Sequence, residues 1–476
     1  MSPPLISKAA ARYTGAGGKE HCSLCRHFSP RRGGRCARVL GDISPRGWCR
    51  LFSREMRGLI ADASSFNSGG GPSLGLDFMV PGVLDPRITF TRASTATYFD
   101  SAGILRTATT NTPRWDYDPV TLALRGLLLE DARTNLAFPS TNWKANATAS
   151  SSVEGVVQNV GVSPSGANDA MAFIPGAFNA LHWQYSTFTG AVNTTYTLSV
   201  FAKAAGLNFF WIRLDNTGFS GVEQWASFNL STGVIDSQSG TSARIQSVGN
   251  GWYRCAVTAT SNATAGATYI AELAPMPVGG FITSNTGNNV SGTWVWGGQI
   301  EVGAFASSYI PTTSAAVARA AEFMSMPASG WYNPTAGSLA VEVIYGGTNG
   351  GAFPVLASLD DGTANNAAII INKATGFTHA EGTAGGVNQW GIAGPTGSTP
   401  YGTVKKAGLS MALNNISYCI NGALATVDLA ATLPAVTTLH LGCNATGATG
   451  AHSVAFRRVS YWSRALSAAE LQTVTT

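Results

Sequence analysis

The sequence predicts a mainly β protein, in which a small metal-cluster N-terminal domain precedes two antiparallel β-sandwich (jelly-roll) domains. Four of the seven cysteines fall within Cys22–Cys49, whereas most of the 55 glycines lie in the rest of the chain. Such a glycine content is typical of β proteins, because many short strands need many turns. Runs such as Tyr196–Lys203 and Phe210–Asp215 alternate apolar and polar residues, as strands with one buried face do.

The clustered cysteines are Cys22, Cys25, Cys36 and Cys49, with the spacing C-x2-C-x10-C-x12-C. A segment this short cannot bury enough apolar area to fold unaided, so it needs a metal, a cluster or disulfides. The first pair can direct both sulfurs at one metal centre, and the other two cysteines can complete a tetrahedral set. The split second pair disfavours zinc. The lack of an apolar signal segment in Met1–Tyr13 disfavours disulfides, although neither alternative is eliminated.

The order Tyr13, Cys-x-x-Cys-x-x-Phe28, Cys36 and Gly-Trp48-Cys resembles the high-potential iron–sulfur proteins over about Tyr13–Phe52. The resemblance implies that the four clustered cysteines bind a [4Fe–4S] cluster, with zinc as the alternative. It also implies that three aromatic residues pack around the cluster and exclude water from it, namely Tyr13, Phe28 and Trp48. The gap before the third cysteine is shorter here than in that family.

Composition and strand pattern divide the chain into consecutive parts. We expect an anchoring domain with the cluster at 1–58, a Gly/Ser-rich flexible linker at 59–75, a short-strand hairpin region at 76–134, a β-sandwich at 135–313, a connector at 314–324 and a second β-sandwich at 325–476.

Two further resemblances concern these sandwiches. The segments Phe90–Tyr98, Leu129–Leu136 and Trp294–Thr312 resemble recurring segments of tailed-bacteriophage structural proteins, especially fibre-like ones. This implies that a jelly roll like those of carbohydrate-binding modules lies at 135–313. At the other end of the chain, a strand leads into Ser467-x-x-Glu470, a capping box that begins a short helix. That arrangement resembles laminin-G-like or concanavalin-type domains.

Aromatic residues in loop-like contexts are candidates for stacking on sugars. They are Trp331, Tyr332, Trp390 and Tyr401, and in the middle domain Trp183 and Tyr185. Burial in a core or over its open ends is the commoner role of such residues. Asp360-Asp361-Gly362 could bind calcium through oxygen, but a turn is the simpler interpretation. We expect Cys255, Cys419 and Cys443 to be reduced core residues.

Several function classes lack sequence support. No P-loop, G-x-S-x-G or H-E-x-x-H motif occurs, and the 25 acidic residues are scattered, so no enzyme activity is expected. No apolar run approaches the length of a membrane span. The net charge is +5, with much of the basic excess before Gly58, and the aromatic residues needed for base stacking are not interleaved with it. We therefore expect no specific nucleic-acid binding.

These features together predict a bacteriophage virion structural protein, most simply a tail fibre or spike assembled in the host bacterial cytoplasm. The cluster domain would dock on other virion proteins at a head or tail attachment ring. The sandwiches would then be displayed as a homotrimer for contact with host cell-surface glycans. The alternatives are a head fibre or capsid decoration protein, an electron-transfer protein that uses the cluster, and a secreted sugar-binding protein.

Overall fold

The computed structural model describes residues 70–141, 159–215, 217–219, 222–263, 268–348, 354–372, 378–395, 402–447 and 452–476, together with short strands at 28–29, 35–36, 39–42 and 156–157. Contacts divide the chain into two units, Met1–Pro72 and Ser73–Thr476. The strands described in the first unit form one antiparallel sheet, in the order β1 (Phe28–Ser29), β2 (Arg35–Cys36) and β3 (Val39–Asp42). The second unit is built almost entirely of antiparallel sheets, which confirms the mainly β prediction.

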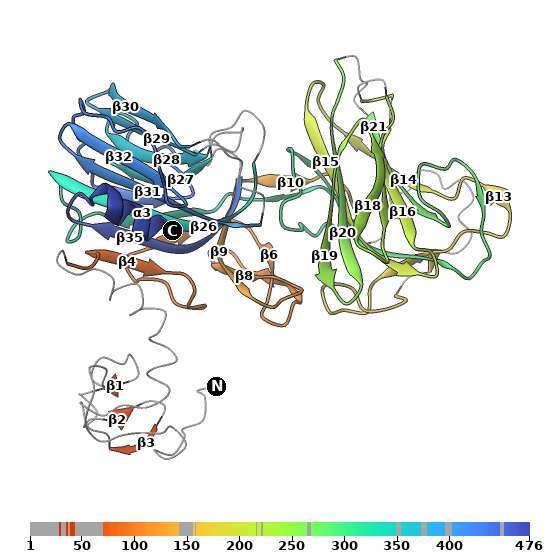
Figure 1. Ribbon diagram of the computed structural model, residues 1–476. Coiled ribbons are helices and arrows are strands. Elements are labelled where there is room, and N and C mark those ends of the chain that lie inside the picture. The colour runs from red at the N-terminus through yellow and green to blue at the C-terminus, as the bar shows by residue number, and fades with distance from the viewer. Residues whose placement is uncertain are drawn as a thin grey trace. The chain divides into compact units, whose positions relative to one another are not determined.

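The C-terminal β-sandwich of the second unit consists of two antiparallel sheets (Figure 1). One sheet has eight strands, which are β33 (Ala423–Leu424), β32 (Asn415–Ile420), β31 (Val404–Ala412), β26 (Ala336–Thr348), β35 (His452–Trp462), β9 (Leu124–Glu130) and β8 (Arg114–Tyr117), with β4 (Leu74–Asp77) also paired to β35. The other has seven, which are β30 (Val387–Ala393), β29 (Thr378–Ala384), β28 (Ala367–Asn372), β27 (Val355–Asp360), β34 (Thr438–Leu441), β25 (Phe323–Pro327) and β5 (Thr89–Thr91).

Alternation along these strands supplies the core of the sandwich. Leu339, Val341 and Val343 of β26 are at most 2% exposed and pack with residues of the opposite sheet such as Leu359 and Leu439. Helix α3 (Ala468–Thr475) follows β35 and begins with the predicted capping box. The Ser467 hydroxyl accepts from the Glu470 N–H, and the Glu470 carboxylate accepts from the Ser467 N–H at 2.8 Å.

The structure corrects three predicted boundaries. The predicted linker 59–75 ends too late, because β4 already begins at Leu74. The segment 76–134 is not a separate hairpin array, because β4 and three further strands complete the C-terminal sandwich. β4 and β9 pair with β35, β8 pairs with β9, and β5 pairs with β25. Only β6 (Ala96–Phe99) and β7 (Leu105–Ala108) form an independent hairpin. β25 begins at Phe323, so the last residues of the predicted connector 314–324 already belong to the sandwich.

The middle β-sandwich is inserted between β9 and β25. Its six-stranded sheet has the order β11 (Val156–Val157), β12 (Met171–Phe173), β23 (Gly292–Val302), β15 (Thr195–Ala205), β20 (Trp252–Thr260) and β19 (Ser242–Gly249). Its five-stranded sheet has the order β14 (Gln184–Thr189), β21 (Thr268–Met276), β16 (Phe209–Leu214), β17 (Gln224–Asn229) and β18 (Val234–Ser239). β13 (Asn179–Ala180) pairs with β22 (Asn285–Thr286). The chain enters through β10 (Arg133–Asn135) and returns through β24 (Val317–Arg319), which form an antiparallel pair.

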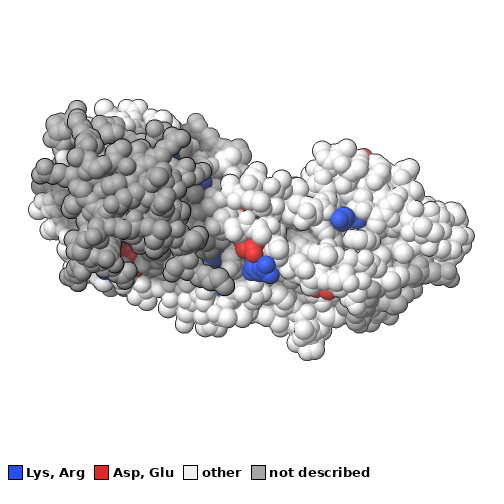
Figure 2. Space-filling model, turned by 90° about the horizontal axis from the view of Figure 1, so that it is seen from below, with Lys and Arg blue, Asp and Glu red and all other residues white. Residues whose placement is uncertain are grey.

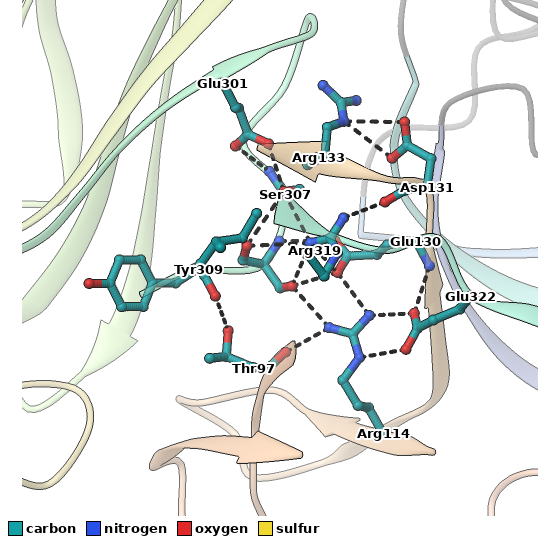
Figure 3. Close-up of polar contacts among 12 residues, drawn as sticks. Thr97, Arg114, Glu130, Asp131, Arg133, Glu301, Ser307, Tyr309, Arg319 and Glu322 are labelled. Carbon is teal, nitrogen blue, oxygen red and sulfur yellow. Dashed lines mark hydrogen bonds and ion pairs between the residues drawn. The ribbon is translucent and has the colours of Figure 1, made fainter. Parts of the chain in front are cut away.

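Buried ion pairs lie where the two sandwiches meet, and we call them the junction cluster: Arg92, Arg114, Glu130, Arg319 and Glu322. Figure 3 shows the last four of these residues. Nη2 of Arg114 lies 2.5 Å from Oε2 of Glu322 and 3.0 Å from Oε2 of Glu130. Nη1 of Arg92 lies 2.6 Å from Oε1 of Glu322, and Nη1 of Arg319 lies 2.9 Å from Oε2 of Glu130. All five side chains are at most 1% exposed.

The segment after β23 ties the middle sandwich to this cluster (Figure 3). The Ser308 N–H and hydroxyl donate to Glu130 at 2.9 and 2.5 Å. The Thr97 hydroxyl donates to the Tyr309 carbonyl at 2.5 Å. The donors and acceptors of these bonds come from the segments Phe90–Tyr98, Leu129–Leu136 and Trp294–Thr312, so those segments build the junction between the sandwiches.

Placing charged groups in a protein interior costs several kcal/mol per ion, and good pairing geometry is needed to offset this cost. Burial alone would raise the pKa of Glu130, but Arg319 and Arg114 outweigh it and hold that pKa far below its usual range. Glu130 is therefore ionised at neutral pH and bound from both sides. Loss of any one partner leaves an uncompensated buried charge.

Glu322→Gln removes the carboxylate that Arg92 and Arg114 share. We expect the free energy of unfolding to fall by about 3–5 kcal/mol, the usual cost of breaking a buried ion pair. Urea denaturation followed by tryptophan fluorescence measures the change. Asp85→Asn is the control, because the exposed pair of Asp85 and Arg87, 2.7 Å apart, should contribute about 1 kcal/mol or less. Equal losses in the two variants would contradict a structural role for the cluster.

Candidate functional site

The predicted cluster ligands Cys22, Cys25 and Cys49 lie outside the described residues, as do Tyr13 and Trp48. The remaining two predicted residues fall on described strands, where Phe28 of β1 pairs with Cys36 of β2. Cluster ligation therefore stays a prediction from the sequence.

Two of the four aromatic residues considered for glycan contact in the C-terminal sandwich, Trp331 and Trp390, are buried in its core. Trp331 is 3% exposed, and its indole N–H donates to the Pro327 carbonyl at 2.8 Å. Trp390 is 1% exposed in the same core. Tyr332 is half-buried against that core, and burial raises its pKa to about 12. The two tryptophans cannot stack on a sugar in this fold, because their rings are enclosed by core side chains. Tyr401 lies outside the described residues.

The outer face of the five-stranded sheet in the middle sandwich carries a row of large side chains. Register places Glu272 of β21 between Tyr185 of β14 and Arg213 of β16. Trp225 of β17 lies on the other side of Arg213. On β16, the residues flanking Arg213 are fully buried in the core, so Arg213 itself belongs to the opposite face. We call these four residues the outer row; it spans three strand spacings, about 14 Å.

Two aromatic pairs lie at the ends of the outer row. The rings of Trp183 and Tyr185 are 5.0 Å apart and tilted by 30°. The rings of Trp225 and Phe281 are 5.3 Å apart and stacked at 22°. All four side chains are partly exposed. The row therefore presents aromatic surface at both ends and a charged pair between them.

The segment after β21 fixes Phe281 over the sheet. The Gly280 N–H donates to the Ser227 hydroxyl at 3.2 Å and to the Asp236 carboxylate at 2.9 Å. The guanidinium carbon of Arg213 lies 5.2 Å from the centre of the Phe281 ring. Backbone hydrogen bonds and a cation–π contact thus hold the ring in place before any ligand arrives.

Arg213 and Glu272 form an ion pair at the centre of the row, through Nε of Arg213. Nη1 of the same guanidinium lies 2.8 Å from Glu223, and Nη2 lies 3.7 Å from Asp215. Glu272 is fully buried, whereas Arg213 is 13% exposed. Burial raises the pKa of Glu272 to about 6, although Arg213 opposes the shift. Oε1 of Glu272 has no hydrogen-bond partner among the described residues.

This arrangement has the chemistry of a sugar-binding surface. Faces of aromatic rings provide large, rigid apolar area with little loss of conformational entropy. Carboxylates and a guanidinium make charge-assisted hydrogen bonds with hydroxyl groups. The face therefore suits a ligand with both apolar faces and hydroxyl groups.

Two of the six residues of this site were candidates from the sequence. Trp183 and Tyr185 were expected to be candidates for sugar contact, but the rest of the row was not identified. The available signal was the alternation in Phe210–Asp215, which places Arg213 on the face opposite the core. The position of Phe281 depends on how its loop crosses the sheet, and no local sequence pattern predicts the path of that loop.

A Ser–Asp–His group on the seven-stranded sheet of the C-terminal sandwich is not a nucleophile site. Asp360 accepts from the Ser358 hydroxyl at 2.7 Å and lies 2.9 Å from Nδ1 of His440. Because Ser358 is bonded to the aspartate, it is not presented to the imidazole that would activate it. Asp360 also accepts from the Gly362 N–H at 3.0 Å, so Asp360–Gly362 forms a turn as predicted.

The isolated cysteines are confirmed as buried free thiols. Burial raises the pKa of Cys255, Cys419 and Cys443, in the last case to about 11, which keeps each as an unreactive thiol. Among the described residues, no group of three or more His, Cys, Asp or Glu side chains could hold a metal ion. Within the same part of the chain, no helix has the length and hydropathy to cross a membrane.

The raised pKa of Glu272 makes stability depend on pH. A carboxyl whose pKa is about 6 in the folded chain, against an ordinary 4.5, binds its proton more tightly when folded. Its contribution is therefore complete below pH 4.5 and is lost, by about 2 kcal/mol, as the pH rises through 6. Urea denaturation of the wild type and Glu272→Gln should show a difference in unfolding free energy that changes across this window. A constant difference between pH 4.5 and pH 6.5 would contradict the assignment.

No family model and no curated protein sequence matches the chain. Among solved structures, the CBM40 of the Ruminococcus gnavus IT-sialidase bound to α2,3-sialyllactose has 16% identity and a TM-score of 0.27, over 30% of this chain and 84% of that chain. The NanB sialidase of Streptococcus pneumoniae has 15% identity and a TM-score of 0.26, over 32% and 26%. A SAP-like pentraxin of Limulus polyphemus has 13% identity and a TM-score of 0.24, over 30% and 70%. At these values the likenesses carry no argument about function.

Proposed function

We propose that the chain is a carbohydrate-binding display protein of a tailed-bacteriophage particle, and that its middle sandwich binds glycans across the outer row. The observation that carries the binding part is the row itself, in which two partly exposed aromatic pairs flank the Arg213–Glu272 ion pair. Sugar rings would stack on Tyr185 and Trp225, while hydroxyl groups would bond the charged groups between them.

The geometry favours an extended ligand over a single sugar. The two aromatic ends of the row are about 14 Å apart along the hydrogen-bonding direction of the sheet. A ligand that touches both ends makes two stacking contacts but loses its translational and rotational freedom only once. Phe281 is already held by the Gly280 contacts, so little ordering is needed on binding. We therefore propose an oligosaccharide chain laid across the strands.

The virion part of the proposal is supported by sequence resemblance. The three phage-like segments, Phe90–Tyr98, Leu129–Leu136 and Trp294–Thr312, supply the residues that join the two sandwiches. In this proposal the N-terminal domain docks on other virion proteins, and the chain assembles as a homotrimer in the host bacterial cytoplasm and lacks enzyme activity. A laminin-G-like or concanavalin-like role for the C-terminal sandwich belongs to the same proposal. A head fibre or decoration protein would use the same parts on the capsid.

Trp225→Ala and Tyr185→Ala test glycan binding at the outer row. Each change removes one stacking surface, and we expect the affinity for an oligosaccharide identified on a glycan array to fall at least about tenfold. Isothermal titration calorimetry gives the values. Trp294→Ala is the matched control, since Trp294 is a half-buried tryptophan on β23 of the other sheet of the same sandwich. Loss of binding in the control alone would place the site on that other sheet.

Metal analysis tests the anchoring domain. If Cys22, Cys25, Cys36 and Cys49 bind a [4Fe–4S] cluster, anaerobically purified protein should carry about four irons per chain and show the visible absorption of such a cluster. Cys22→Ser should lose both signals while the two sandwiches stay folded. Stoichiometric zinc without iron would support the alternative ligand set, and protein free of both metals would contradict metal binding.

A further inference from the structure

We propose that the outer row selects neutral sugar chains and rejects acidic ones, an inference that rests on the proposed function of this face. In the described residues of the middle sandwich, the five-stranded sheet and its flanking residues carry a single lysine or arginine, Arg213. The same part carries four carboxylates, which are Asp215, Glu223, Asp236 and Glu272.

All three nitrogens of the Arg213 guanidinium already face carboxylates. Nε donates to Glu272, Nη1 lies 2.8 Å from Glu223, and Nη2 lies 3.7 Å from Asp215. Recognition of a sugar carboxylate or sulfate normally uses a guanidinium whose paired donors point at the ligand. Nε and Nη1 are hydrogen-bonded to acids and Nη2 lies near a third, so an acidic sugar would have to compete with these three carboxylates for the guanidinium.

The other basic side chains described in this sandwich are on the six-stranded sheet. Lys203 lies on β15, with its ammonium 5.4 Å from the centre of the Trp294 ring, and Arg244 and Arg254 lie on β19 and β20. Because the two sheets pack with the core between them, these charges are on the far side of the sandwich from the outer row. They therefore offer no compensation to an anion bound there.

The local charge is consequently negative. One guanidinium and three contacting carboxylates give a formal charge of −2 with Glu272 ionised (+1 − 3). Charged residues make up only 12% of the chain, and they are few on the described surface seen in Figure 2. An acidic ligand would therefore meet repulsion that no lysine or arginine beside the row offsets within the part of this sandwich that the structure describes. A neutral sugar instead offers hydroxyl donors to the same carboxylates, of which Glu223 is 37% exposed.

Matched glycan pairs test this selectivity on the full-length protein. Each pair contains a neutral oligosaccharide and the same oligosaccharide capped with a carboxylated sugar, such as lactose-terminated and sialyllactose-terminated chains. We expect neutral members to bind at least about tenfold more tightly than their acidic counterparts at low ionic strength. The ratio of the two affinities should fall as added salt screens the charges. Glu223→Gln should also narrow the ratio, because it removes the most exposed of the three carboxylates.

The outcomes separate the two claims. Tighter or equal binding of the acidic members would overturn the selectivity while leaving glycan binding intact. Binding to neither member of any pair would overturn the proposed function itself. A preference for neutral members that persists unchanged in Glu223→Gln and at high salt would show that shape, and not charge, is responsible, and would overturn the electrostatic argument.

Discussion

The buried ion pairs of the junction cluster are the constraint on which the second unit depends. Glu322 and Glu130 are shared among three arginines from distant parts of the sequence, and all five side chains are almost fully enclosed. Buried charges are stable only when every partner is present, because only well-placed opposite charges offset the free energy of removing each charge from water. The cluster therefore specifies one way of joining the strands before β10 to those after β24. Hydrophobic contacts are non-directional, so by themselves they would allow other ways of joining these strands.

This construction leaves the middle sandwich free to carry function. Its attachment uses β10, β24 and the segment around Ser308, all at the junction, while the outer face of the five-stranded sheet takes no part in it. Sheet register then aligns Tyr185, Glu272, Arg213 and Trp225, and the hydrogen-bonded segment after β21 holds Phe281. A site built mainly on strands is rigid, so its contribution to affinity comes from preorganisation.

Local patterns in the sequence were sufficient for some features and insufficient for others. Period-two alternation identified the mainly β fold and the middle sandwich, and the spacing of Ser467 and Glu470 identified the final helix, because each depends on neighbouring residues. The pairing of β4 and β9 with β35 joins residues more than 300 positions apart, so no window of sequence reports it. For Trp331 the sequence left sugar contact and the commoner core burial both open for a related reason, since turn-like neighbours do not show that a ring points into the core, where the structure places it. Arg213 lay on a correctly predicted strand, yet its partners come from other strands and from a loop.

Hydrogen–deuterium exchange of the full-length protein, with and without a bound neutral oligosaccharide, tests most directly where a ligand is held. The account predicts slower exchange on binding in β14, β16, β17, β21 and the segment around Phe281, with the six-stranded sheet and the C-terminal sandwich unchanged. Protection confined to the C-terminal sandwich, or to the six-stranded sheet of the middle sandwich, would contradict it.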